Sequence, residues 1–437
     1  MSRLRSFELA DFTLDNGLRV LVAPEPQLHR VHLALHVRTG SRYESPETNG
    51  LSHFLEHMIY RGTPRLPSAH AVNDAFERLG GNLYAATQTD FGIFSLTLPE
   101  ESLDQASALF GEVLKSPAFL DIEVEKGIVC EEILEDKDDD GREVDADNLS
   151  RALIYPDHPL GYTITGDEAH VQSFTAAMLR EHHERHYVAR GSVLTFTGAV
   201  TREEALRLAQ RDFGALPRGE WIPAIPPPDD QDRPRLLIVP NQSSQTDLRV
   251  CFRAPSEKSK ERAATDLLLR IIDDGMSTRL YHRICDDQGL CYDVNAGYDG
   301  YEDDGVVDFA AGVQHKRVDK VTREILALMT ELASEGPTGD ELTKAKRRHA
   351  WDLEAMLDSA DDVGSFLGGG ALFDTLETPA ERHDALARIT ADEVRNVALL
   401  LADPRRLNVV AVGKLDPREA KRLEDSVMGF TGPRKAE

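Results

Sequence analysis

The segment from Gly50 to Tyr60 places three residues capable of chemistry within an otherwise apolar stretch. On an α-helix, His53 and His57 lie four positions apart, so their imidazoles project from one face, one turn from each other. Two neutral imidazoles with this spacing can share a zinc ion. Glu56 lies on the flank, where it can reach a water molecule on that metal without being a ligand. The segment therefore predicts a metal site that works on water.

The remaining residues of this segment indicate a helix that is buried on nearly all sides. They are Leu51, Phe54, Leu55, Met58 and Ile59. Buried ionisable groups cost free energy unless they are paired or bound to a metal. A histidine pair is more often structural than a ligand pair, and His-x-x-Glu-His fixes only three positions. We favour the metal site because the helix is apolar and because a third ligand is available downstream.

The third ligand is expected in the segment from Glu125 to Glu132, since a catalytic zinc usually has three protein ligands and one open position. Glu125 and Glu132 are two helical turns apart and share a face. Glu131 points about 100° away around the helix axis. Taken alone, these carboxylates are also compatible with the surface charges of an acidic helix, so the spacing leaves the choice open.

The composition indicates a multidomain protein and excludes some classes of binding partner. The chain has 437 residues, of which 41% are hydrophobic, and a net charge of -26. This length exceeds what one core normally serves, and the charge argues against nucleic acid or an anionic membrane as a partner. The four cysteines form no disulfide framework, and no signal-like or membrane-spanning apolar run is present. We therefore expect a cytoplasmic protein.

A proline-rich polar linker at residues 217–234 predicts the main domain boundary. It separates an N-terminal domain, residues 1–216, from a C-terminal domain, residues 235–437. The second half repeats the order of elements of the first, although it lacks the His-x-x-Glu-His set. We expect an α+β fold with two similar domains, each a mostly antiparallel sheet covered by helices.

Hydrophobic periodicity and turn signals predict the individual elements. Strands are expected at 12–23 (with a turn at Asn16-Gly17), 31–38, 82–89, 92–98, 192–198, 236–239, 247–254, 306–313 and 407–413. Helices are expected at 50–60, 67–79, 101–117, 121–137, 175–186, 203–213, 258–274, 318–334, 340–357, 390–401 and 417–425. His32 and His36 share one strand face, which we interpret as a packed or solvated sheet surface rather than a ligand pair.

Other groups of reactive residues give weaker signals. His182 and His186 are four apart in a polar helix without a distant acid, so we do not expect a metal there. The glycine run that starts at Gly368 follows no strand and lacks the lysine of a phosphate loop. Cys285 and Cys291 are compatible with a redox pair, although dispersed thiols are the simpler interpretation.

The His53-to-His57 motif, followed after 74 residues by Glu132, resembles the zinc set of the M16 family of metallopeptidases. That family includes the mitochondrial processing peptidase, pitrilysin and insulin-degrading enzymes. Further similar segments extend the resemblance over essentially the whole chain: Gly50-Leu-Ser-His, Arg61-Gly-Thr, Gly80-Gly81 and Gly275-Met-Ser-Thr-Arg-Leu-Tyr. The length resembles the short, two-domain subfamily, whose members work as clam-shell dimers.

The resemblance implies a zinc endopeptidase of peptides or unfolded segments. It implies one Zn²⁺ per chain held by His53, His57 and Glu132, with Glu56 as the general base and Glu125 as a supporting carboxylate. It also places the substrate as an added strand along one sheet edge. The residues of that edge are Gly81, Asn82, Leu83, Tyr84 and Ala85.

Two departures from the family pattern bear on activity. Tyr84 replaces a substrate-contacting asparagine, and Asn82 is displaced from that position by two residues. In the second half, active members of the family have the pattern Arg-x6-Tyr. This chain has Tyr292 at the tyrosine position but Cys285 at the arginine position, and Arg283 lies two residues before that position. We therefore expect a heterodimer in which a second M16-like subunit supplies the arginine and tyrosine, with a homodimer otherwise. The alternative is a non-catalytic core subunit of an M16-type complex.

Overall fold

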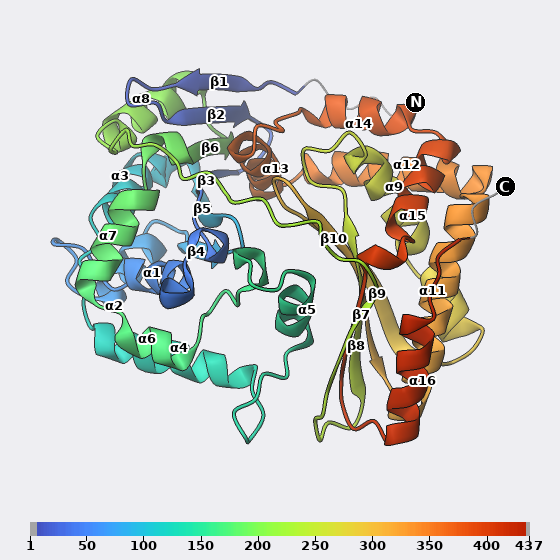
Figure 1. The fold of residues 1–437 in the computed structure, drawn as a ribbon. Helices are drawn as coiled ribbons and strands as arrows, with labels where there is room; N and C mark the ends of the chain where they lie inside the picture. Colours follow the sequence, from blue (N-terminus) through green and yellow to red (C-terminus); the bar gives the residue numbers. More distant parts are fainter. Residues whose placement is uncertain (1–6, 434–437) are drawn as a thin grey trace. The chain divides into compact units, whose positions relative to one another are not determined.

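The computed structural model describes residues 7–433, which form two compact units (Figure 1). Unit 1 comprises the chain up to Glu135, Tyr162–Ile225 and Trp351–Arg382. Unit 2 comprises Asp136–Gly161, Pro226–Ala350 and the chain from His383 onward. This partition differs from the expected domains 1–216 and 235–437, because one segment of each half of the sequence belongs to the unit of the other half.

Packing explains the two exchanged segments. The helix α13 (Ala360–Leu372) lies on β3 and β6 of unit 1, where Val363 and Leu367 join a cluster with Leu21 and Val193. In unit 2, the helix α5 (Ala146–Ile154) covers β11 and β8. Each segment buries its apolar side chains on a sheet whose strands lie mostly in the other half of the sequence. Hydrophobic periodicity within one segment cannot reveal such a partner.

The sheet of unit 1 has six strands in the order β1-β2-β6-β3-β5-β4. Their bounds are Ala10–Thr13, Arg19–Pro24, Ser192–Gly198, Arg30–Val37, Gly92–Pro99 and Tyr84–Thr87, respectively. Only β2 and β6 are parallel neighbours; the other pairs are antiparallel. The expected strand over 12–23 is therefore a hairpin, as the Asn-Gly turn predicts, and β4 forms the edge of the sheet.

Helices pack on both faces of this sheet. The remaining α-helices of unit 1 are α1 (Leu51–Ile59), α2 (Ala69–Glu77), α3 (Leu103–Lys115), α4 (Ile122–Glu135), α6 (Glu168–Ser173), α7 (Ala176–His186) and α8 (Arg202–Phe213). One large core fills the space between the sheet and α1, α3 and α8, with Phe54, Phe94 and Phe110 almost fully buried. This core holds α1 as a buried helix, as its composition predicts.

The sheet of unit 2 has five strands in the order β7-β11-β8-β10-β9. Their bounds are Arg235–Val239, Leu407–Val412, Thr246–Ala254, Gly305–Val313 and Cys291–Gly300, respectively. The α-helices are α5, α9 (Arg262–Ile272), α10 (Arg279–Tyr281), α11 (Val318–Glu335), α12 (Gly339–Met356, continuing into unit 1), α14 (Pro379–Arg388, spanning the last boundary), α15 (Ala391–Leu401) and α16 (Pro417–Met428). Sequence patterns missed α5, α6, α10, α13, α14 and β9.

The five strands of unit 2 repeat β2-β6-β3-β5-β4 of unit 1 in spatial order, chain order and direction. The single parallel pair, β7 with β11, corresponds to β2 with β6. Helix α9 follows β8 as α1 follows β3. These observations confirm an α+β fold built from two similar, mostly antiparallel sheets covered by helices.

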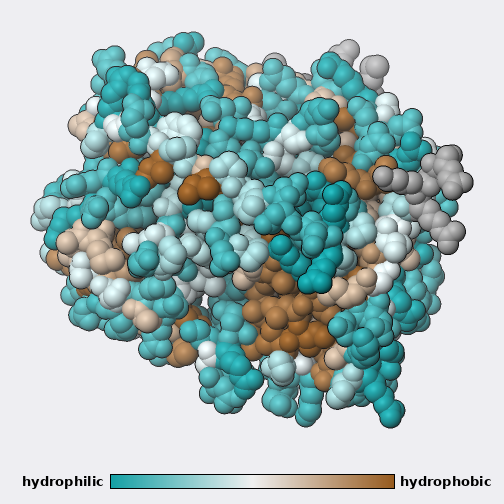
Figure 2. All heavy atoms as spheres, in the orientation of Figure 1, coloured by the Kyte–Doolittle hydropathy of each residue, from teal (hydrophilic) through white to brown (hydrophobic). Residues whose placement is uncertain are grey.

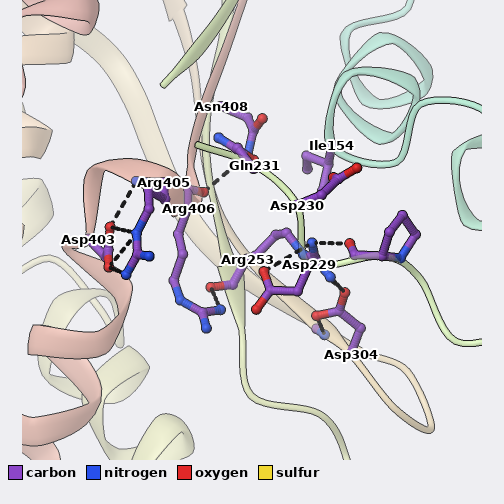
Figure 3. A network of polar contacts seen from close by, with 12 residues as sticks. Ile154, Asp229, Asp230, Gln231, Arg253, Asp304, Asp403, Arg405, Arg406 and Asn408 are labelled. Atoms are coloured by element: carbon purple, nitrogen blue, oxygen red, sulfur yellow. Dashed lines mark hydrogen bonds and ion pairs between the residues drawn. The ribbon is translucent and has the colours of Figure 1, made fainter. Parts of the chain in front are cut away.

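The linker is fixed at both ends by polar contacts. In unit 1, the Arg38 guanidinium lies 4.2 Å from the ring centre of Trp221. In unit 2, the buried Arg253 donates to the carbonyl of Pro228 at 2.7 Å and forms an ion pair with Asp304 (Figure 3). Gln231 donates to the carbonyl of Leu407 at 3.0 Å. The proline-rich segment is therefore an ordered connection within its described length.

The surface agrees with the acidic composition. Hydrophilic side chains cover most of the face in Figure 2. A hydrophobic area lies over α5 and β7, where Leu149, Leu153 and Leu237 are only partly buried. No helix within residues 7–433 is long and apolar enough to cross a membrane.

Candidate metal centre

The first turn of α1 is held by a buried carboxylate that sequence reasoning missed. Glu44 accepts hydrogen bonds from the backbone N–H of Ser52 at 2.7 Å and of Gly50 at 2.8 Å, and from the amide of Asn49 at 3.1 Å. Burial raises the pKa of Glu44, while these hydrogen bonds oppose the rise. The carboxylate thus satisfies N–H groups that a helix leaves without intrahelical partners.

A second contact fixes the same turn through Ser52. Its hydroxyl lies 3.0 Å from Nε2 of His182 on α7 and accepts a hydrogen bond from the N–H of Gly40 at 3.2 Å. His186 contacts the carbonyl of Arg38 through Nδ1 at 3.0 Å. His182 and His186 are therefore buried residues whose ring nitrogens contact Ser52 and the backbone of Arg38.

His53, His57 and Glu132 converge as the motif predicts. One ligand atom from each residue lies within 4.8 Å of the others. Glu132 reaches from α4, with its carboxylate oxygens 3.4 Å from Nε2 of His53 and 3.6 Å from Nε2 of His57. This is the one group of three or more potential metal ligands within residues 7–433.

Glu125 lies on the face of α4 that is turned away from solvent, and it orients His57. Its carboxylate lies 2.8 Å from Nδ1 of His57 and also pairs with Arg61. Burial raises the pKa of Glu125, but the hydrogen bonds from His57 and Arg61 outweigh burial and lower it below its usual range. An ionised Glu125 that binds Nδ1–H directs the lone pair of Nε2 towards Glu132 and His53.

The two histidines have opposite electrostatic surroundings. Burial lowers the pKa of His53 to about 3, so this imidazole is neutral and can donate a lone pair. Burial also lowers the pKa of His57, but Glu125, Glu56 and Glu132 raise it more, so its net shift is upward. A cluster of carboxylates that favours positive charge at this point is the setting that suits a bound cation.

Glu56 lies next to the three convergent residues and is held by β4. Thr87 donates a hydrogen bond from its hydroxyl to the carboxylate of Glu56 at 2.5 Å. Burial raises the pKa of Glu56, and the negative charge of Glu132 adds to the rise, while Thr87 and His57 oppose it. A carboxylate with a raised pKa next to a site for a water molecule is suited to take a proton from that water.

The alternatives left open by spacing are resolved by geometry. Glu131 is exposed and belongs to no group of potential ligands, while Glu132 faces the histidines and Glu125 lies behind them. His32 and His36 are buried against α13, as a packed sheet face predicts. A Cβ at Gly364 would lie 2.6 Å from the His32 ring, so the glycines of α13 make room for these imidazoles.

The predicted substrate edge is β4, which pairs only with β5. Tyr84 and Asn82 are exposed there, Leu83 and Ala85 are half-buried, and Gly81 is buried. The hydroxyl of Tyr60 donates to the carbonyl of Leu83 at 3.2 Å. The strand therefore offers an unpaired backbone edge within the same unit as the convergent residues.

Two family models match consecutive parts of the chain. Residues 19–168 match the family described as insulinase (peptidase family M16), and residues 173–348 match the one described as peptidase M16 inactive domain. The chain belongs to peptidase family M16. The matches include parts of both units, and the first contains His53, Glu56, His57 and Glu132.

Similar proteins support the M16 assignment. An uncharacterized zinc protease from Bacillus subtilis is 28% identical over 83% of this chain and 87% of its own length. A protease from Helicobacter pylori has a TM-score of 0.86 at 22% identity, covering 93% of this chain and 99% of its own. A peptidase M16 inactive domain from Pseudomonas fluorescens has a TM-score of 0.86 at 21% identity, covering 94% and 100%. These structures show the same fold.

The donor set fits the zinc implied by the M16 relatives. A neutral His53, a His57 oriented by Glu125, and a carboxylate from Glu132 are ligands that zinc takes in sites with an open position. Nδ1 of His53 is buried and has no hydrogen-bond partner among the described residues, so Nε2 alone carries its contact with the site. Three protein ligands leave room for water next to Glu56.

The residues at the positions of the family's arginine and tyrosine belong to unit 2. Tyr292 is 92% exposed on β9, and Cys285 belongs to a π-helical turn, His282–Asp286. Arg283 forms ion pairs with Glu324 and Glu331 at 3.1 Å. Arg283 is thus engaged within unit 2 and does not take the place of the arginine that Cys285 replaces.

Proposed function

We propose that this protein is a zinc-dependent endopeptidase that cleaves peptides or unfolded segments. The observation that carries the proposal is the convergence of His53, His57 and Glu132 within 4.8 Å, with Glu56 beside them. His53, His57 and Glu132 would hold the zinc. When bound, zinc supplies Lewis acidity towards the scissile carbonyl and lowers the pKa of water.

The residues of the chain account for the remaining steps. Glu56 accepts a proton from the attacking water and passes it to the leaving amine. Thr87 holds the carboxylate of Glu56 in place, and Glu125 keeps His57 in one ring orientation. The edge of β4 binds the substrate as an added strand, which gives affinity through backbone hydrogen bonds without strong sequence preference.

A second subunit completes the site in this proposal. The exposed Tyr292 is available to a facing chain, but Cys285 cannot supply the charge of the family arginine. We therefore expect the active form to be a heterodimer whose partner carries both arginine and tyrosine and needs no zinc motif. Full peptidase activity of the purified chain alone would contradict this arrangement.

The test of catalysis is Glu56→Gln. The variant should keep stoichiometric zinc, because Glu56 is not a ligand, and should lose hydrolysis of a flexible peptide by about 10²–10⁴-fold, the usual contribution of a general base. Glu131→Gln is the matched control, because Glu131 is an exposed carboxylate on α4. Unchanged hydrolysis in Glu56→Gln would refute the assignment.

The competing function is a non-catalytic core subunit of an M16-type complex. Cys285 favours it, and so does the family model described as inactive that covers residues 173–348. In that case the wild-type chain, alone or with its partner, would bind zinc without hydrolysing peptides, and Glu56→Gln would change nothing. Co-expression with the candidate partner followed by peptide hydrolysis separates the two functions.

A further inference from the structure

Two half-buried thiols lie side by side in unit 2. The Sγ atoms of Cys285 and Cys291 are 3.9 Å apart. Cys285 belongs to the π-helical turn, and Cys291 is the first residue of β9. Both are free cysteines in this structure. The two sulfurs are close enough that a movement of about 2 Å would bring them to the length of a disulfide bond.

The backbone between the two cysteines already holds them together. Leu290 donates to the carbonyl of Ile284 at 2.9 Å, and Gly289 donates to the carbonyl of Cys285, also at 2.9 Å. Arg317 adds hydrogen bonds to the carbonyls of Gly289 and Leu290. The thiols therefore face each other across an ordered turn, and only the movement of about 2 Å separates them from disulfide length.

The other two cysteines have different surroundings. Cys251 is 1% exposed within β8. Cys130 on α4 is half-buried and contacts the amide of Gln172. No second thiol lies within hydrogen-bonding distance of either one among the described residues. Only Cys285 and Cys291 form a dithiol in the described part of the chain.

We propose that Cys285 and Cys291 are a redox modification site that closes to a disulfide with low-molecular-weight disulfides as oxidants. The thiolate of one cysteine attacks a sulfur of the oxidant, forms a mixed disulfide and releases one thiolate. The second cysteine, after losing its proton, attacks the protein sulfur of the mixed disulfide and releases the second thiolate. The two cysteines are oxidised, and the small disulfide is reduced to two thiols.

The charges around the dithiol select the oxidant. Burial raises the pKa of Cys285, and Asp293, Asp286 and Asp273 add to the rise. Burial also raises the pKa of Cys291, to about 12. Arg317 acts in the opposite sense on Cys291, but the three carboxylates outnumber it, so they repel anionic oxidants and attract cationic ones. We therefore expect cystamine, which is cationic, to react faster than glutathione disulfide, which is anionic.

The consequence concerns the start of β9. Closing the disulfide ties the π-helical turn to the residue that precedes Tyr292. This part rests on the proposed dimer, in which the exposed Tyr292 is available to a facing chain while the partner supplies the tyrosine of the zinc site.

The test uses the purified full-length chain, first reduced and freed of reductant, then treated with cystamine or glutathione disulfide. After the remaining thiols are alkylated under denaturing conditions, mass spectrometry should find two fewer alkyl groups on the intact chain than on a reduced and alkylated sample. The digest of the oxidised chain should contain a peptide linked between Cys285 and Cys291. At equal concentration, cystamine should react about tenfold faster at low ionic strength, and added salt should narrow the difference.

Three matched variants control the assignment. Cys285→Ser and Cys291→Ser should lose the cross-link and stop at a mixed disulfide on the remaining cysteine, while Cys130→Ser should keep the cross-link. Circular dichroism of each variant verifies its fold, and either serine variant suffices if the other does not fold. The proposal is overturned if the wild-type chain gives only mixed disulfides or chains linked through Cys130. Because the readout is a mass, a failure of the peptidase proposal leaves this result interpretable.

Discussion

The two units carry the same five-stranded arrangement, but only one carries a metal centre. Helix α1 follows β3 and presents His53, Glu56 and His57; helix α9 follows β8 and presents Leu267, Leu268 and Ile271 to the core. Both helices are packed against their sheets. The difference teaches that the fold supplies a buried helix beside a sheet edge, and that a few side chains turn this position into a candidate site.

The supports around the two helices differ in the same way. The buried Glu44 holds the start of α1, whereas Glu261, the residue before α9, makes no side-chain capping hydrogen bond. Thr87 on β4 contacts Glu56, while the corresponding edge strand β9 begins with Cys291 and Tyr292. In unit 1, buried polar groups therefore fix the position of one helix, as expected for a site that requires defined geometry.

The largest effect is expected from making α1 resemble α9. His57→Leu removes one of three ligands, so the chain should lose bound zinc and hydrolysis should fall by about a thousandfold or more. Elemental analysis and a peptide assay measure both. His70→Leu on α2 is the control, because His70 is exposed and is not one of the proposed ligands. Retention of zinc in His57→Leu would break the comparison.

The next effect concerns the support of a ligand rather than the ligand itself. Glu125→Gln removes the charge that binds Nδ1 of His57 and should weaken zinc affinity by about 10–100-fold. Competition with a chromophoric chelator measures the affinity. Glu135→Gln, an exposed change on the same helix, should leave it unchanged. Equal affinities for the two variants would show that Glu125 only packs against Arg61.

A smaller effect is expected from the cap of α1. Glu44→Gln leaves one carbonyl oxygen where two carboxylate oxygens accept three hydrogen bonds, and should destabilise the fold by about 1–3 kcal/mol. Urea unfolding with zinc removed by a chelator measures this. Glu47→Gln, an exposed change three residues later, is the control. A variant as stable as wild type would mean that water replaces the lost acceptor.

The smallest effect is a pH dependence that belongs to unit 1. Burial lowers the pKa of His32 to about 4 and of His36 to about 3, from an ordinary value near 6.5. Below pH 6.5 the unfolded chain binds protons that the folded chain refuses, so each histidine should cost about 1 kcal/mol of stability per pH unit as pH falls towards 4.

Urea unfolding of apo-protein at pH 7.5 and 5.5 checks this sign. His36→Gln should flatten the decline, because a neutral amide replaces the titrating ring, and His29→Gln, at an exposed position, should not. Unit 2 offers the contrast: the corresponding face of β8 carries Arg249 and Arg253 in ion pairs with Asp147 and Asp304. A steeper decline in His36→Gln than in wild type would contradict the role of burial.

Much of the fold followed from periodicity, and the misses have a common physical cause. The strands and helices that alternate or repeat at 3.6 residues, such as β3, α3 and α11, lie within a few residues of their expected bounds. Helices α5 and α13 were missed because their apolar faces are short and are satisfied only by sheets distant in the sequence. Strand β9 was missed because its exposed, acidic edge lacks the hydrophobic alternation of a half-buried strand.

Some residues of the candidate site could be predicted from the sequence and others could not. The spacing of His53 and His57 fixed a shared face of one helix, because helix geometry is local. It left Glu125, Glu131 and Glu132 as rivals, and it gave no sign of Glu44 or Thr87. These residues act through contacts between segments, and a carboxylate or hydroxyl that caps or orients has no periodic signature of its own.

The sequence alone determined the residue types, the local geometry of the motif helix, the acidic surface and the order of elements in both halves. Only the tertiary structure decided that Glu132 faces the histidines, that Glu125 orients His57, that Glu44 holds the helix start and that two thiols meet in the second unit. The reason is that secondary structure depends on neighbours within about one or two turns, whereas a ligand set or a thiol pair depends on which distant faces bury each other.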